Sequence, residues 1–176
     1  MISSTVNDPA TSAASGAPAP IALGATEGEA YWFFGSLVIL KSTSDSTAGR
    51  VMVTENLGPR GTGSPLHVHH REDEWFYVIE GELTLWVGGQ VITAPAGAFV
   101  YGPRNVPHTF MVSSEQARYL LVTEPAGFDN FIRAVGEPAP RLEVPPAPAA
   151  PPDMQRIMQL AAESGMEILG PPGIPA

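Results

Sequence analysis

The feature that most limits the folds open to this chain is a series of short runs of strand-forming residues, each closed by a turn signal. The runs are rich in Val, Ile, Thr and aromatic side chains, as β-strands are. Turn residues separate them, for example at Gly81, at Gly88-Gly89 and at Pro95-Ala96-Gly97. Strands this short at such close spacing predict an all-β fold, a sandwich or a barrel. The runs occupy residues 31–34, 36–40, 50–56, 66–70, 74–79, 83–87, 90–94, 98–101, 107–112 and 117–123.

One of these runs, 74–79, carries apolar side chains on both of its faces. Because side chains alternate along a strand, Trp75 and Tyr77 share one face while Phe76 and Val78 share the other. A strand that is apolar on both faces is typical of the inside of a layered structure. We therefore expect this strand to be buried on both sides.

Two helices are predicted after the strands. Between Pro125 and Gly136, apolar residues recur at helical spacing and predict a helix over 126–135 that lies on the strand layers. Asp153 suits the N-cap of a second helix that stops at Gly165. We interpret both helices as packing elements. The apolar positions are Phe128, Phe131, Ile132 and Val135 in the first helix, and Met154, Ile157, Met158 and Ala161 in the second.

The prolines divide the chain into segments. Of the 19 prolines, 13 lie outside residues 27–136, and those between Pro138 and Pro152 cannot supply N–H groups to a β-ladder. That stretch is therefore predicted to be an extended linker or strap. The expected segments are a disordered arm at 1–26, the β-structure with its flanking helix 126–135 at 27–136, the Pro-rich strap at 137–152, and a C-terminal helix and tail at 153–176.

Residues 1–26 consist mainly of Ala, Ser, Thr, Gly and Pro and carry one charged side chain, Asp8. They lack a basic region ahead of an apolar run, and no stretch of the chain reaches the roughly 18 apolar residues of a membrane span. This composition is typical of a disordered arm. We expect neither a signal peptide nor an anchor, and a cytoplasmic protein.

The composition also removes several kinds of chemistry. The chain has no Cys, which excludes disulfides, iron–sulfur clusters, thiolate zinc sites and Cys nucleophiles. Any metal must then be held by nitrogen and oxygen ligands. The formal charge of −9 and the single lysine, Lys41, argue against nucleic acid or an anionic membrane as the main partner, because both reward basic patches.

Histidines and carboxylates gather in two of the strand-like stretches. In an extended strand His67 and His69 point the same way, so their imidazoles can converge on one cation. A carboxylate from the next strand can supply a third ligand, and His108 a fourth. An unbroken strand would place Asp73 on the side of the histidines, whereas Glu74 requires a turn or bulge between residues 70 and 73. Alternation alone leaves the choice open.

These residues resemble the two sequence motifs of the cupin superfamily, in a single-domain arrangement. Gly61, His67, His69, Glu74 and Gly81 meet the first motif at its full spacing, and the second is met at Gly97, Pro103 and His108. There are two departures. Asn105 stands where the family has Gly, a mild change because Asn tolerates positive φ, and Val112 stands where the family has Asn. The resemblance implies a cupin-type β-sandwich, or jelly-roll barrel, over about residues 28–136.

The resemblance also implies which residues bind metal. His67, His69, Glu74 and His108 would hold one divalent transition metal, either Ni, Mn, Fe, Co, Cu or Zn, with coordination positions left open. The family's spacing selects Glu74, so Glu72 and Asp73 are interpreted as a solvated acidic turn. By strand alternation His70 faces away from the site, into solvent or outside the ligand set.

Some apolar residues near these ligands have two interpretations. Phe76, Val78 and Phe110 share faces with the proposed ligands and either line a substrate pocket or pack in the core. The aromatic residues of run 31–34 are either core residues or, as is common in the family, part of an exchanged N-terminal strand in a homodimer. The sequence leaves both interpretations of each set open.

Among cupins, the chain resembles bacterial quercetin 2,3-dioxygenase-like members, notably in its Tyr-Trp-Phe-Phe segment at 31–34 and its His-Val-His-His-Arg-Glu-Asp-Glu run at 67–74. That resemblance implies O₂-dependent cleavage of a flavonol or a related aromatic or enolic small molecule, with Glu74 both metal ligand and general base. Two other classes remain open. One is a non-redox metal-dependent enzyme, such as an isomerase, decarboxylase or polyketide cyclase, and the other is a non-catalytic binding protein.

Overall fold

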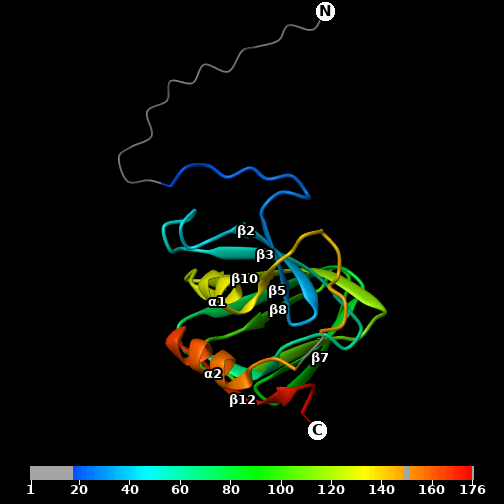
Figure 1. The fold of residues 1–176 in the computed structure, drawn as a ribbon. Coiled ribbons are helices and arrows are strands. Elements are labelled where there is room, and N and C mark those ends of the chain that lie inside the picture. Colours follow the sequence, from blue (N-terminus) through cyan, green and yellow to red (C-terminus); the bar gives the residue numbers. More distant parts are fainter. Residues whose placement is uncertain (1–17, 149–150, 176) are drawn as a thin grey trace, which may run out of the picture.

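The strands form two antiparallel sheets that face each other (Figure 1). This arrangement comes from a computed structural model that describes residues 18–148 and 151–175. It confirms the all-β prediction, and every predicted run overlaps a strand, with five of the runs extending one or two residues beyond it. One sheet has the order β11 (Glu137–Pro138), β1 (Glu29–Phe33), β2 (Ser36–Ser42), β3 (Met52–Pro59), β10 (Gln116–Glu124), β5 (Asp73–Glu80) and β8 (Phe99–Gly102). The other has the order β12 (Met166–Pro172), β4 (Pro65–His69), β9 (His108–Val112), β6 (Glu82–Val87) and β7 (Gln90–Pro95).

The core lies between the two sheets, where alternate residues of each strand point inward. In β3 and β10 buried and half-buried residues alternate along most of the strand, as expected when one face meets the core. The largest fully buried apolar side chains come from both sheets and from the helix at residues 128–135, so the interior is a packed core. They are Phe76, Leu40, Met52, Leu83, Leu85 and Ile132.

Strand β5 is buried on one side only, which corrects the expectation from its sequence. Phe76 and Val78 face the core, but Tyr77 on the opposite side is 46% exposed. Its register partner on β8, Phe99, is 63% exposed. Beside them Trp75 pairs with Tyr101, and their rings stack at 5.5 Å. Periodicity shows that this face is apolar, but no second layer covers it in the described chain. We call Trp75, Tyr77, Phe99 and Tyr101 the outer aromatic face.

Both predicted helices are present, as α1 (Phe128–Val135) and α2 (Met154–Glu163). Figure 1 shows them packed side by side against the strand layers. Asp153 caps α2 as expected, because its side chain accepts a hydrogen bond from the backbone N–H of Arg156. Helix α1 buries Phe131 and Ile132, and α2 buries Ile157, all within the same cluster as the barrel core. The helices therefore close part of the barrel.

The chain after α1 returns to both sheets. Strand β11 pairs with β1, residues 139–148 form no further helix or strand, and β12 pairs with β4. Within β12, Met166 lies opposite His69 and Ile168 opposite His67. The sequence predicts only a helix and a tail here. The structure adds an edge strand beside the two histidines.

The N-terminal segment is described only in part. The predicted disordered arm, 1–26, lies outside the described residues up to residue 17, and residues 18–26 contain no helix or strand. The Lys41 ammonium donates to the carbonyls of Gly24, Ala25 and Glu27 and holds this segment on β2. Strand β1 pairs with β2 and β11 of its own chain. Within the described residues no helix is long and apolar enough to cross a membrane.

Candidate metal centre

Four side chains with metal-ligating atoms meet inside the barrel. His67 and His69 come from β4, Glu74 from β5 and His108 from β9. The two sheets contribute together, and within one of them His67 lies directly opposite His108 in the β4–β9 register. One donor atom from each side chain lies within 4.8 Å of the others. All four residues are buried, with exposed fractions of 1 to 4%.

A break between β4 and β5 turns Glu74 inward. Strand β4 ends at His69 and β5 begins at Asp73, with a bend between them. Alternation along β5 then directs Glu74 toward the core and Asp73 outward, where it accepts hydrogen bonds from Arg104. The turn that the choice of Glu74 required is thus present. Asn105, which stands where the family has Gly, adopts the left-handed backbone conformation with φ of 63°.

The hydrogen bonds of the histidines define their tautomers. Nδ1 of His67 lies 2.8 Å from the carbonyl oxygen of Pro65, and Nδ1 of His108 lies 2.9 Å from that of Val106. A carbonyl can only accept, so both Nδ1 atoms carry the proton. Nδ1 of His69 lies 3.3 Å from the Glu72 carboxylate, which makes it a donor too. In the neutral rings every Nε2 therefore turns a lone pair toward the centre.

In the neutral rings these lone pairs face one another. The Nε2 atoms of His67 and His69 are 3.2 Å apart. Nε2 of His108 and Oε2 of Glu74 are 3.0 Å apart, yet neither atom has a hydrogen-bond partner in the described part of the chain. Buried acceptors that converge in this way repel one another unless a cation lies among them. The cluster fits a single divalent metal ion with three nitrogen ligands and one carboxylate.

Burial and mutual charge shift the pKa values of three of the four ligands. Burial, with the neighbouring charges of His108 and His69, lowers the pKa of His67 to about 3. Burial opposes ionisation of Glu74, but the contact with His108 and the other imidazoles hold the pKa of its carboxyl below the usual value. Burial lowers the pKa of His108, but the adjacent Glu74 carboxylate raises it by more, so the pKa of His108 is raised overall. At neutral pH His67 is a neutral donor and Glu74 an anion.

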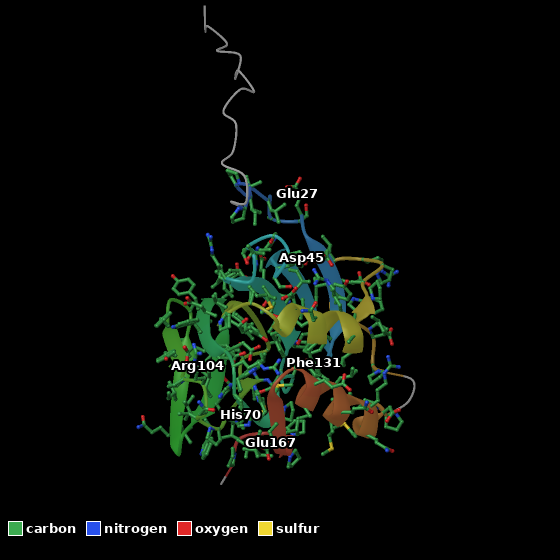
Figure 2. The ribbon with its side chains drawn as sticks, turned by 90° about the vertical axis from the view of Figure 1, so that its left-hand side faces the viewer. Glu27, Asp45, His70, Arg104, Phe131 and Glu167 are labelled. Carbon is green, nitrogen blue, oxygen red and sulfur yellow. The ribbon has the colours of Figure 1, made fainter. Side chains whose placement is uncertain are left out.

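Glu72 does not lie in a solvated turn, contrary to the expectation from sequence. It is only 4% exposed and its carboxylate contacts His69. His70, which follows His69 in the sequence, points away from the cluster as expected. Figure 2 shows His70 next to Glu167 of β12. Its Nε2 lies 3.4 Å from a carboxylate oxygen of Glu167, and its Nδ1 lies 3.1 Å from Oδ1 of Asn105. Spacing carries no signal that separates a buried Glu72 from an exposed one.

A second polar side chain near the centre, Thr123, is likewise not predicted from the sequence. Thr123 on β10 lies directly opposite Glu74 of β5 and is fully buried. Cross-strand neighbours on one face have Cβ atoms about 4.5–5.5 Å apart, so the two side chains are neighbours in the interior. The Thr123 hydroxyl has no hydrogen-bond partner among the described residues. It is the kind of group that a ligand in the interior would satisfy.

The predicted pocket residues separate into two groups. Phe110 lines a cavity of about 40 Å³ inside the barrel, together with Tyr119 and Asn56. Phe76 and Val78, the other two, pack in the core and do not line this cavity.

Helix α1 covers the metal centre from one side, where the ring centroids of Phe128 and His69 are 5.4 Å apart.

Fold and site together define a metal-binding protein of the cupin class. Residues 53–123 match the family model described as "Cupin domain". Two solved structures show the same fold, each at 20% identity. An RmlC-like cupin from Shewanella frigidimarina has a TM-score of 0.53 over 62% of this chain and 94% of its own. A variant oxalate decarboxylase from Bacillus subtilis has a TM-score of 0.56 over 65% of this chain and 32% of its own. The chain belongs to the cupin superfamily.

Within that superfamily the chain resembles the quercetinase-like members. The quercetin 2,3-dioxygenase of Bacillus subtilis (strain 168) is 30% identical to it over 119 residues, which are 68% of this chain. The chain spans 35% of the length of that dioxygenase. The resemblance therefore covers the barrel and its metal centre rather than the whole of the longer protein.

Proposed function

We propose that this chain is a metal-dependent dioxygenase of the quercetinase-like cupin type, which cleaves a flavonol or a related enolic or phenolic compound with O₂. The observation that carries the proposal is the convergence of three Nε2 lone pairs and one carboxylate in a buried barrel interior. The similarity of the barrel to a protein named quercetin 2,3-dioxygenase supports the choice of reaction.

When bound, a divalent transition ion supplies Lewis acidity that lowers the pKa of an enol or phenol hydroxyl and, with a redox-active metal, electron transfer to O₂. The part of Glu74 in such a reaction follows from its position. Its carboxyl is ionised, and its Oε2 is free of hydrogen bonds among the described residues. Glu74 can therefore take the hydroxyl proton of a substrate held beside it, as well as bind the metal.

The residues around the centre exclude water and limit access. The four ligands are at most 4% exposed, and none of them lines the cavity of about 40 Å³ beside Phe110. Pockets for larger ligands measure about 300–1,000 Å³. Binding of a flavonol therefore requires elements around the barrel end, such as α1 with Phe128, to move outward. A closed interior of this kind protects reactive species from hydrolysis.

Oxygen consumption by the purified protein tests the proposal. Samples are reconstituted separately with Fe, Mn, Ni, Co and Cu and assayed in an oxygen electrode with a flavonol and a panel of catechols and enediols. We expect O₂ uptake matched by substrate loss in at least one pairing. Glu74→Gln should keep much of the metal and lose turnover, whereas Glu115→Gln, an exposed control, should match the wild type.

Two results would replace the proposed reaction with another. Conversion of the substrate without O₂ would assign the centre to non-redox enzymology. Saturable binding with no product, for every metal, would assign it to a binding protein. Unchanged turnover in Glu74→Gln would remove Glu74 from the role of base while leaving its role as ligand open to direct metal titration.

We also propose that the chain forms a homodimer through the outer aromatic face. Tyr77, Phe99 and Tyr101 are each at least 45% exposed and adjoin one another across β5 and β8. Contiguous apolar patches of this kind mark interaction sites on soluble proteins. Light scattering should report a dimer for the wild type and a monomer for Phe99→Glu. A monomeric wild type at micromolar concentration would rule this interface out.

A further inference from the structure

The carboxylate of Glu72 is buried beside the metal centre without a cationic partner. Its side chain is 5% exposed, and in the described residues its one ion-pair or hydrogen-bond contact is with Nδ1 of His69, at 3.3 Å. Buried carboxylates are retained where a specific partner needs them, because their desolvation is costly. The buried position of Glu72 next to His69 therefore indicates that Glu72 acts on this histidine.

Glu72 differs from the groups that hold the other two histidines. Nδ1 of His67 and Nδ1 of His108 donate to backbone carbonyls, which are neutral and which no substitution can remove. His69 donates to a side chain that carries a negative charge. A carboxylate acceptor on a metal-binding imidazole fixes its tautomer and makes the opposite nitrogen a stronger donor. Among the three ligand histidines, His69 is the one whose outer partner is a side chain.

Helix α1 holds both members of this pair in place. Gly127, the N-cap residue of α1, has no side chain to cap the helix, and a Cβ there would lie 3.4 Å from Oε1 of Glu72. The carboxylate thus lies at the helix N-terminus, where the helix dipole favours negative charge. The next residue, Phe128, packs edge-to-face against the His69 ring at 5.4 Å. One end of α1 therefore lies close to the carboxylate and packs on the imidazole.

We infer that Glu72 is a positioning residue of the metal centre, which orients His69 with its Nε2 toward the ion and links that ligand to the start of α1. The inference rests on the metal centre of the proposed function and is independent of the reaction that follows. Glu72 does not touch the substrate or the ion. It acts through His69, so its loss weakens metal binding without removing a ligand.

Direct metal titration tests the inference without any assay of activity. Full-length wild type, Glu72→Gln and Glu72→Ala are stripped of metal and titrated with Co(II), with calorimetry for affinity and visible absorption for coordination geometry. Loss of a partner of this kind typically weakens metal binding by about 10–100-fold. We expect the larger loss in Glu72→Ala, a smaller one in Glu72→Gln, which keeps an acceptor but no charge, and an altered Co(II) absorption band in both.

Asp73→Asn is the matched control, since it removes an adjacent negative charge that points outward to Arg104. It should bind Co(II) like the wild type. Glu72→Gln is close in shape to Glu72, and melting curves with chelator establish that each variant is folded. Wild-type affinity and an unchanged spectrum in both Glu72 variants would overturn the inference while leaving the metal centre intact. A wild type that binds no Co(II) would overturn the centre itself, and the inference with it.

Discussion

Removing metal from this protein should lower its thermal stability by a measurable amount. The reason lies in the four ligands, whose lone pairs converge within 4.8 Å while Oε2 of Glu74 and Nε2 of His108 lack hydrogen-bond partners in the described chain. An unfolded chain separates these groups and relieves their repulsion. A divalent ion that binds the folded form alone therefore adds its binding free energy to folding.

The size of the effect follows from linkage. At a free metal concentration 100 times Kd the stabilisation is about 2.7 kcal/mol. For chains of about 150–250 residues, 1 kcal/mol shifts Tm by about 2–4 °C. We therefore expect Tm to rise by about 5–11 °C when the metal-free protein is saturated, and to rise further with metal concentration.

Thermal unfolding followed by circular dichroism, with chelator or with added Co(II), measures this shift. His108→Gln removes one ligand and should lose most of the increment. His70→Gln, a histidine that is half-exposed and outside the ligand cluster, should retain it. Equal increments in the two variants would mean that the metal binds elsewhere on the chain. No increment in the wild type would refute the reasoning from converging lone pairs.

Three further substitutions have expected outcomes that stability measurements can check. Thr123→Val replaces a buried hydroxyl that lacks a partner among the described residues. The free energy of unfolding of the metal-free protein, measured in urea, should therefore rise by about 1–3 kcal/mol. A fall would show that the hydroxyl has a bound partner. Hydrogen bonds from Arg104 lower the pKa of Asp73 to about 2 from 3.8, so their stabilisation is present above about pH 4 and is lost as pH falls toward 2. Arg104→Ala should flatten this part of the stability profile, and an unchanged profile between pH 2 and 5 would contradict the pairing. Gly63→Ala would place a Cβ 2.0 Å from the carbonyl oxygen of Phe110. The free energy of unfolding should therefore fall by more than about 4 kcal/mol. A Tm near that of the wild type would count against this close approach.

The strands and the convergence of the four side chains were predictable mainly from local signals. Alternation over a few residues marks a strand, and it places His67 and His69 on one side without knowledge of the rest of the fold. The turn before Glu74 is also local, since it follows once the ligand spacing is accepted. His108 lies 34 residues further along the chain, yet its place is set by the β4–β9 register, which brings it opposite His67.

Elements that depend on distant partners were not predictable in the same way. Strand β12 pairs with β4, about 100 residues away, and its Gly and Pro residues give no alternating signal. The outer face of β5 posed the opposite problem. Its aromatic residues satisfy the pattern of a buried strand, but whether Tyr77 meets another layer or solvent depends on the rest of the fold. Periodicity reports which residues share a face and not what covers that face.

The three consecutive acidic residues before Trp75 lie in three different environments. Glu72 lies in the bend and turns under α1 to meet His69, Asp73 begins β5 on its outer side and binds Arg104, and Glu74 turns inward to the metal centre. Their side chains have nearly the same chemistry, so residue type cannot assign these roles. The bend after His69 assigns them, because it ends one strand and sets the phase of alternation in the next. A one-residue shift of that phase would exchange the environments of Asp73 and Glu74 and place an uncompensated carboxylate in the core. The length of this bend is therefore as important to the metal centre as the ligands themselves.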